Sequence, residues 1–248
     1  MGSDKTGRIV WHDLFTRDRP RVMSFYRVIA EWHYKTEHAT DFAWGSGVQD
    51  YVLALSGMQA GAGIIDAPAE MAPGWVAYVE VDDVDDSADL AARLGGSIMR
   101  APFDVPGVGR NALLRDPNGA VIGIALSRHS FPVPKRQFGA ELYASDARPF
   151  PLDFYGPLFD WMPKGGQGDG QRLLTATGHH IAKTVGEVPS AQWVPSVKVA
   201  NPPEAVRKAA LIGRVGDIHH AAETSCPSGR FIRDPDGTVI HLTEWQKT

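Results

Sequence analysis

The sequence predicts an α+β protein made of two similar halves, and two repeated features carry this prediction. A strand that opens with Trp-Val at Trp75 returns at Trp193, and a D-P-x-G turn that opens at Asp116 returns at Asp234. Both repeats are separated by 118 residues (193 − 75 and 234 − 116). Because a strand, a helix, a Gly-Arg pair and a D-P-x-G strand recur in the same order, the pattern indicates a tandem duplication.

The first half opens with a strand over residues 9–16. Asp18 is a typical N-cap residue, and Pro20 suits the first turn of a helix. Apolar residues then recur at helical spacing over residues 22–29, which predicts an amphipathic helix. Strand-like runs broken by glycines fill residues 41–66, so we expect two or three antiparallel strands there.

The same order of elements then returns. A strand over residues 75–81 precedes a helix over residues 85–94, which Gly95 and Gly96 end. Three strands follow, and D-P-N-G joins the last two as a hairpin turn. The second half begins with a strand over residues 139–145 and repeats the plan. Each half is therefore expected to hold two β-α-β-β-β modules.

The duplication divides the chain into two domains. We expect the first over residues 7–127, a linker over residues 128–137, and the second over residues 138–246. The linker contains two prolines and several basic residues, which is typical of a connecting segment. A chain of 248 residues is long enough for two such domains with their own cores.

Composition and charge argue against several classes of function. Hydrophobic residues make up 43% and charged residues 22% of the chain, which is typical of a soluble globular protein. The net charge of −4 argues against a nucleic-acid partner, and no apolar run approaches the length of a membrane span. The single cysteine, Cys226, excludes an internal disulfide and suits a reducing compartment. We therefore expect a cytoplasmic monomer or homodimer that binds a small molecule.

The four modules and their D-P-x-G hairpins resemble the vicinal oxygen chelate superfamily. This group contains glyoxalase I, the bleomycin resistance proteins, the fosfomycin resistance enzymes and the extradiol dioxygenases. The segments V-D-D-V-D, P-G-V-G-R and R-D-P-N-G-A are most similar to tandem glyoxalase-like proteins. The resemblance implies that each half curls into a cup-shaped sheet that holds a metal or a ligand.

The resemblance also implies where a metal would bind. Metal-dependent members carry His or Gln on the first strand, His or Glu on the fifth, and Glu on the eighth. The matching positions in the two halves are Trp11, Val76 and Gly123, then Gly139, Val194 and His241. Only His241 can coordinate a metal. We therefore expect no bound metal or other cofactor, and the alternative is a divalent ion such as Zn, Ni, Mn or Fe on non-standard ligands.

Strand alternation predicts which other side chains face the cups. The first cup is expected to contain Trp11, Asp13, Phe15, Val76, Tyr78 and Glu80. The second cup is expected to contain Glu141, Tyr143, Ser196, Lys198, His241 and Thr243. With this assignment of strand faces, Asp13 and Glu141 occupy equivalent positions in the two halves.

Asp13, Glu141 and His241 are the candidate catalytic residues. A carboxylate on an otherwise apolar strand is costly unless it has a partner, and burial would raise its pKa toward neutrality. The competing interpretation is that the two carboxylates form structural ion pairs that fix the module interface. We expect His12 on the opposite, helix-packed face as a core histidine with satisfied hydrogen bonds.

Two classes of function follow from these residues, with a third left open. The first is a binder or catalyst without the usual metal, whose apolar cup accepts a small organic molecule. Its expected ligand-binding residues are Trp11, Phe15, Tyr78, Glu80, Tyr143 and Lys198. The second is a divalent-metal lyase or dioxygenase that uses residues such as Asp13, Glu141 and His241. The third is a dimerisation module with a vestigial cup.

Overall fold

The computed structural model describes most of the chain. The described residues are 5–40, 47–145, 148–165, 171–187, 190–212 and 230–245. Cys226 and its predicted loop lie outside these ranges. In the described part, no helix combines the length and the apolar character needed to cross a membrane.

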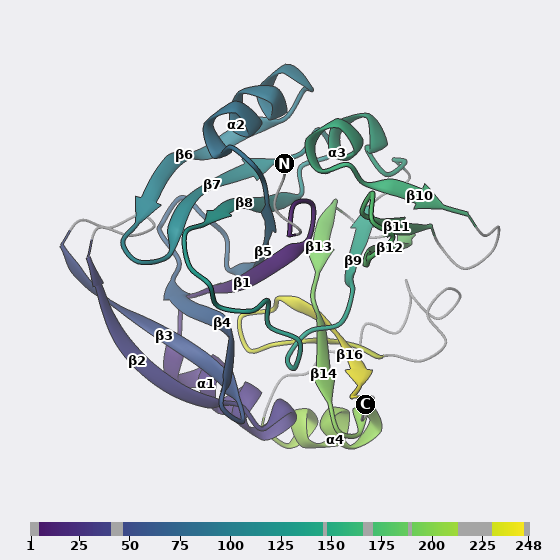
Figure 1. The fold of residues 1–248 in the computed structure, drawn as a ribbon. Helices are drawn as coiled ribbons and strands as arrows, with labels where there is room; N and C mark the ends of the chain where they lie inside the picture. Colours follow the sequence, from purple (N-terminus) through teal and green to yellow (C-terminus); the bar gives the residue numbers. More distant parts are fainter. Residues whose placement is uncertain are drawn as a thin grey trace.

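The first half forms one continuous sheet of eight strands (Figure 1). Its elements are β1 (Ile9–Thr16), α1 (Arg19–Ala30), β2 (His33–Thr40), β3 (Val48–Ser56), β4 (Gln59–Asp66), β5 (Gly74–Glu80), α2 (Val84–Arg93), β6 (Ser97–Val105), β7 (Gly109–Arg115) and β8 (Val121–Ser127). The strand order is β2-β3-β4-β1-β5-β8-β7-β6, so two β-α-β-β-β modules meet where β1 pairs with β5. The strands after α1 begin at His33, earlier than the predicted residue 41.

Local sequence explains the first helix. The Asp18 side chain accepts a hydrogen bond from the backbone N–H of Arg21, and Pro20 lies in the first turn, as predicted. The helix buries one face, which carries Val22, Phe25, Tyr26 and Ile29. It ends before Glu31, which adopts the left-handed conformation with φ 57° and turns the chain toward β2.

The second half repeats the plan with a broken sheet. Its elements are β9 (Glu141–Ser145), α3 (Leu152–Phe159), β10 (Met162–Lys164), β11 (Arg172–Leu174), β12 (His180–Glu187), β13 (Gln192–Val194), β14 (Ser196–Val199), α4 (Pro202–Leu211), β15 (Arg230–Arg233) and β16 (Val239–Glu244). The two sheets have the orders β10-β11-β12-β9-β13 and β14-β16-β15. The break falls at Pro195, where β5 has Ala77 (195 − 118), because proline cannot donate a ladder hydrogen bond.

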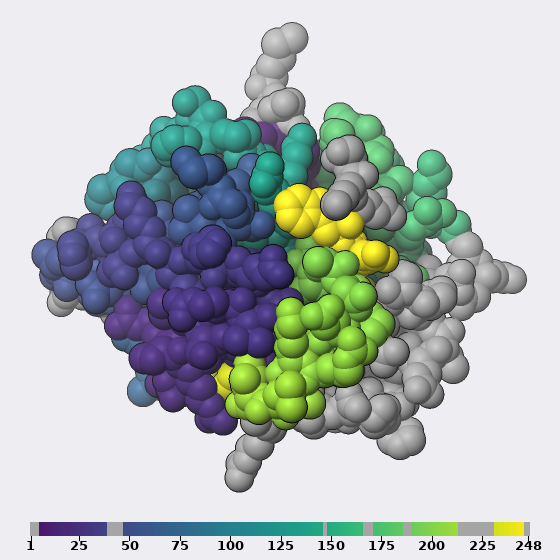
Figure 2. All heavy atoms as spheres, turned by 90° about the horizontal axis from the view of Figure 1, so that it is seen from below, coloured from purple at the N-terminus to yellow at the C-terminus, as the bar shows by residue number. Residues whose placement is uncertain are grey.

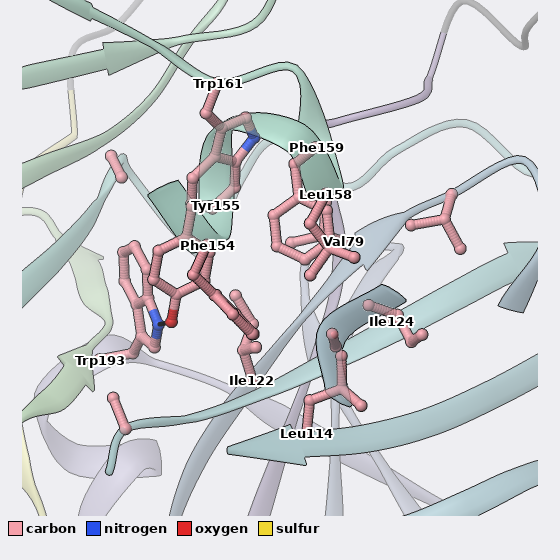
Figure 3. Close-up of a cluster of buried hydrophobic side chains, with 14 of the residues drawn as sticks. Val79, Leu114, Ile122, Ile124, Phe154, Tyr155, Leu158, Phe159, Trp161 and Trp193 are labelled. Carbon is pink, nitrogen blue, oxygen red and sulfur yellow. Dashed lines mark hydrogen bonds between the residues drawn. The ribbon is translucent and has the colours of Figure 1, made fainter. Parts of the chain in front are cut away.

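The helices pack in two pairs, and each pair joins modules from different halves. α2 and α3 cover one core, which contains Leu114 and Ile122 of the first half together with Tyr155 of α3 (Figure 3). α1 and α4 cover a second core, and Figure 2 shows them side by side, α1 in purple and α4 in light green. The two halves therefore share both helix-covered cores. This α+β fold of paired β-α-β-β-β modules agrees with the prediction.

A hydrogen-bonded relay ties each D-P-x-G turn to a helix of the other half. In the first relay, Trp75 Nε1 donates to Tyr26 Oη at 2.8 Å, and Tyr26 Oη donates to Asp234 Oδ2 at 3.1 Å. All three residues are buried. Each polar atom of the relay thus finds its partner in the interface between the halves, as buried polar groups require.

The second relay uses the equivalent residues. Trp193 Nε1 donates to Tyr155 Oη at 2.9 Å (Figure 3), and Tyr155 Oη donates to Asp116 Oδ2 at 2.9 Å. Tyr155 follows Tyr26 by 129 residues (155 − 26), whereas the tryptophans and the turn aspartates are 118 apart. The first and second modules therefore repeat with different spacings.

Candidate functional site

Asp13 lies in the first cup at the centre of a cluster of aromatic hydrogen-bond donors. Its carboxylate atom Oδ1 accepts hydrogen bonds from Tyr51 Oη at 2.8 Å and from Trp11 Nε1 at 3.0 Å. Tyr78 also hydrogen-bonds to this carboxyl group. The Asp13 residue is only 7% exposed, whereas Trp11 and Tyr51 are half-buried. The cluster therefore reaches from the floor of the cup to its open surface.

Burial dominates the electrostatics of this cluster. It raises the pKa of Asp13 above its usual value, and the hydrogen bonds from Tyr51, Tyr78 and Trp11 act against this rise. Burial, with the nearby Asp13 charge as the next cause, holds the pKa values of Tyr51 and Tyr78 well above their usual value. Both phenols therefore stay protonated and act as donors to the carboxyl group.

The strand register shows why the expected metal positions of the first cup carry no ligand. Trp11 pairs with Tyr78, and Tyr78 pairs with Gly123, so these residues form one row across β1, β5 and β8. The fifth-strand residue beside Trp11 is thus Tyr78, and Val76 lies opposite Asp13 instead. A Cβ atom at Gly123 would clash with the Tyr78 ring. The ring occupies the space that an eighth-strand glutamate would need.

Most of the remaining buried wall of the first cup is apolar. Its buried wall contains Phe15, Ile65, Met71, Val76, Leu113 and Ala125. Glu80, the other predicted polar residue, is buried at the end of β5, where it accepts hydrogen bonds from the Ser127 backbone N–H at 3.1 Å and Oγ at 2.7 Å. Both Phe15 and Glu80 therefore shape the cup from positions that solvent does not reach.

His241 and Ser196 are buried polar residues of the second cup. The two side chains contact each other. His241 Nδ1 lies 3.0 Å from Ser196 Oγ, and the His241 ring centroid lies 5.0 Å from that of Phe231. Burial, followed by the positive charge of Lys183, lowers the pKa of His241 to about 4. His241 is therefore a neutral imidazole at pH 7, bound to a hydroxyl group on the neighbouring strand.

The predicted orientation of Glu141 and Tyr143 is wrong. Glu141 Oε1 lies 2.6 Å from His12 Nε2, in the seam between the halves, and Tyr143 Oη donates to Asp116 Oδ2 at 2.8 Å on the helix-packed side. The prediction aligned Glu141 with Asp13, but the observed spacing of 129 residues aligns it with His12 (141 − 12). An error of one residue on a strand exchanges its two faces.

Lys198 contacts the linker, and His12 lies on the face of β1 opposite to Asp13. Lys198 is half-buried, and its Nζ donates to the backbone oxygen of Lys135 in the linker at 2.8 Å. His12 is buried, bonded to Glu141 and stacked on Phe138 with ring centroids 3.9 Å apart. His12 is thus the satisfied core histidine that the sequence predicts.

The described side chains do not fit a divalent-metal site. They bring no group of three His, Cys, Asp or Glu residues together. Asp13 lies in the first cup, Glu141 in the seam and His241 in the second cup, so these three residues cannot share one ion. A lone carboxylate or imidazole does not supply the three or more protein ligands of such sites.

Tyr51 is a member of the cluster that sequence reasoning missed. It lies on β3, and β4 separates β3 from β1 in the sheet. Its hydroxyl reaches Asp13 over Gly63, where a Cβ atom would clash with both side chains. The sequence signals were the alternation of β3 and the glycine at position 63, but neither specifies the order of strands.

Sequence comparison finds relatives for about half of the chain. No family model matches the sequence. The chain is 32% identical over 122 residues to proteins named "Putative glyoxylase CFP32" from Mycobacterium bovis and Mycobacterium tuberculosis. The alignment covers 49% of this chain and 44% of each relative. The chain thus matches less than half the length of these relatives.

Similar solved structures cover nearly the whole chain. The 2,3-dioxygenase LapB from Pseudomonas sp. KL28 matches 98% of this chain and 93% of its own with a TM-score of 0.57 at 16% identity. A mutant of 4-hydroxymandelate synthase from Streptomyces coelicolor matches 97% and 93% with a TM-score of 0.58 at 14% identity. The Mn(II)-bound glyoxalase from Novosphingobium aromaticivorans matches 97% and 82% with a TM-score of 0.56 at 15% identity. The chain therefore has the fold of the vicinal oxygen chelate superfamily.

Proposed function

We propose that the protein binds a small, largely apolar organic compound in the first cup, without the divalent metal that the fold commonly holds. The observation that carries this proposal is the Asp13 carboxyl group, buried in an apolar cup and held by Tyr51, Trp11 and Tyr78. Largely apolar walls with a few oriented polar groups are what small-molecule sites present. The relatives named glyoxylase support a site for a small molecule in this chain.

The half-buried aromatic residues define the expected ligand. Trp11 and Tyr51 offer flat surfaces at the open side of the cup, so an aromatic ring would stack there. Asp13 would accept a hydrogen bond from a polar group of that ligand. Because burial raises its pKa, it would also serve as a general base for a ligand with an acidic C–H or O–H group.

A divalent-metal lyase or dioxygenase is the second candidate. The Mn(II)-bound glyoxalase and the dioxygenases of the same fold favour it. The described residues of this chain favour the first candidate, because no three His, Cys, Asp or Glu side chains among them come together. With its single cysteine, the protein is proposed to work in the cytoplasm.

A ligand screen with site variants tests the proposal. We would measure the thermal shift of the protein with a library of small aromatic compounds, and repeat each positive result on Trp11→Ala and on His241→Gln. Trp11→Ala should weaken binding by about 1 kcal/mol or more through lost stacking, whereas His241→Gln in the second cup should not. Equal binding to all three proteins would show that the first cup is not the site.

A further inference from the structure

An open cleft of about 940 Å³ lies beside the linker that joins β8 to β9. In Figure 1 this linker is the teal segment that runs from β8 to β9 between the two halves. The walls of the cleft come from the starts of β1, β4 and β12, from the linker, from β14 and from Trp245 directly after β16. Asp13 is not among the lining residues, so the cleft is separate from the cluster in the first cup.

Every ionisable side chain among the described residues that line this cleft is basic. Four are cations, Arg8, Lys135, Arg136 and Lys198, three are histidines, and none is Asp or Glu. In the described part of the chain, the four cations form no ion pair with a carboxylate. The whole chain has a net charge of −4, so the cleft differs in sign from the protein that surrounds it.

Hydrogen bonds fix the linker backbone that carries two of these cations, Lys135 and Arg136. Gln59 Oε1 accepts from the backbone N–H of Lys135 at 2.9 Å and from that of Arg136 at 3.1 Å. Lys198 Nζ donates to the backbone oxygen of Lys135 at 2.8 Å, which keeps two more of its protons available. Because the linker is already held in place, a ligand would lose less affinity to the ordering of its site.

Aromatic rings lie next to the cations. The guanidinium carbon of Arg136 lies 5.6 Å from the centroid of the Trp245 ring, and Phe138 stacks on His12 deeper in the cleft. A guanidinium group over an indole ring keeps its N–H edge available for an oxyanion. The cleft therefore offers donors for an anion and flat surfaces for an organic framework.

We propose that this cleft binds a small organic anion through its phosphate or carboxylate oxygens, with Arg8 and Lys198 as the principal contacts. A cleft lined by charge of one sign concentrates ligands of the opposite sign. Burial lowers the pKa of the Lys198 ammonium group. A bound anion would offset that cost by pairing with the charged form.

Calorimetric titration of the purified full chain at low ionic strength tests this proposal. The probes are pyrophosphate and citrate, which present phosphate and carboxylate oxygens respectively. We expect at least one of them to bind, and Arg8→Gln and Lys198→Gln each to weaken that binding about tenfold, since each removes a charge-assisted hydrogen bond. Binding of pyrophosphate alone would assign the site to phosphates, and binding of citrate alone would assign it to carboxylates.

Arg93→Gln is the matched control. It removes one exposed positive charge from the last turn of α2, outside the cleft. The Arg8 side chain makes no hydrogen bond or ion pair with the described residues, so Arg8→Gln should fold normally, and a thermal melt checks this. The proposal is overturned if neither probe binds at millimolar concentration. It is also overturned if Arg8→Gln and Lys198→Gln weaken binding no more than Arg93→Gln does.

Discussion

His12 and Glu141 hold equivalent places in the two halves, and they bind each other with 2.6 Å between Nε2 and Oε1. Their separation of 129 residues (141 − 12) equals that of Tyr26 and Tyr155, which are the middle members of the two relays. Both side chains are buried. A contact between equivalent residues is what an approximate two-fold arrangement produces on its axis. This pair joins β1 to β9, which share no ladder of hydrogen bonds.

Removal of one member of this pair should destabilise the protein strongly. We expect Glu141→Ala to lower the free energy of unfolding by about 3 kcal/mol, because it leaves the buried His12 nitrogen without its partner. The double variant His12→Leu with Glu141→Leu should cost less, since no polar group is then left unpaired. Urea unfolding of the three proteins measures both effects. A loss below about 1 kcal/mol in Glu141→Ala would contradict a structural role for the pair.

The two relays predict unequal effects for matched tyrosine substitutions. Asp116 Oδ2 accepts hydrogen bonds from both Tyr155 and Tyr143, whereas Tyr26 is the described donor to Asp234 Oδ2. Tyr155→Phe should therefore cost about 1 kcal/mol, and Tyr26→Phe about 2 kcal/mol or more. Denaturant unfolding of the two variants checks the order. The relays would not act as described if Tyr155→Phe were the more damaging change.

The raised pKa of Asp234 predicts that the stability of the protein depends on pH. Burial raises the pKa of Asp234 from 3.8 to about 6. Between these values the folded protein holds the proton more tightly than the unfolded chain, so stability from this group falls as pH rises through the window. Asp234→Asn removes this dependence. The unfolding free energy of the parent minus that of the variant should thus fall by about 2 kcal/mol from pH 4 to pH 7. A difference that stays constant, or rises, would show that Asp234 is not perturbed.

The repeated turns and tryptophans were enough to predict the fold because they fall at the same point of the second module in each half. The spacing of 118 residues does not apply to the first modules, where Tyr26 and Tyr155 are 129 apart. The face that Glu141 occupies could not be predicted from the second-module spacing alone. The break at Pro195 was visible in the sequence, but its consequence depends on which strand lies beside it.

The sequence predicted only part of the candidate site, because local alternation relates residues on one strand and not residues on different strands. Alternation along β1 correctly places Trp11 and Asp13 on one face, because they are neighbours on one strand. Tyr51 reaches the same carboxylate from β3, two strands away in the sheet. Local periodicity does not determine the order of strands, so this partner became visible only in the structure.

The most direct test of the central claim uses the compound that binds most tightly in the thermal-shift screen. Its dissociation constant is measured for protein dialysed against EDTA, with the parent, Asp13→Asn and Ser196→Ala compared. The account predicts that the parent binds as tightly after dialysis as after addition of Mn(II). It also predicts that Asp13→Asn weakens binding by about 1–3 kcal/mol, while the second-cup control Ser196→Ala binds like the parent. Binding that requires the metal, or that is unchanged in Asp13→Asn, would contradict the account.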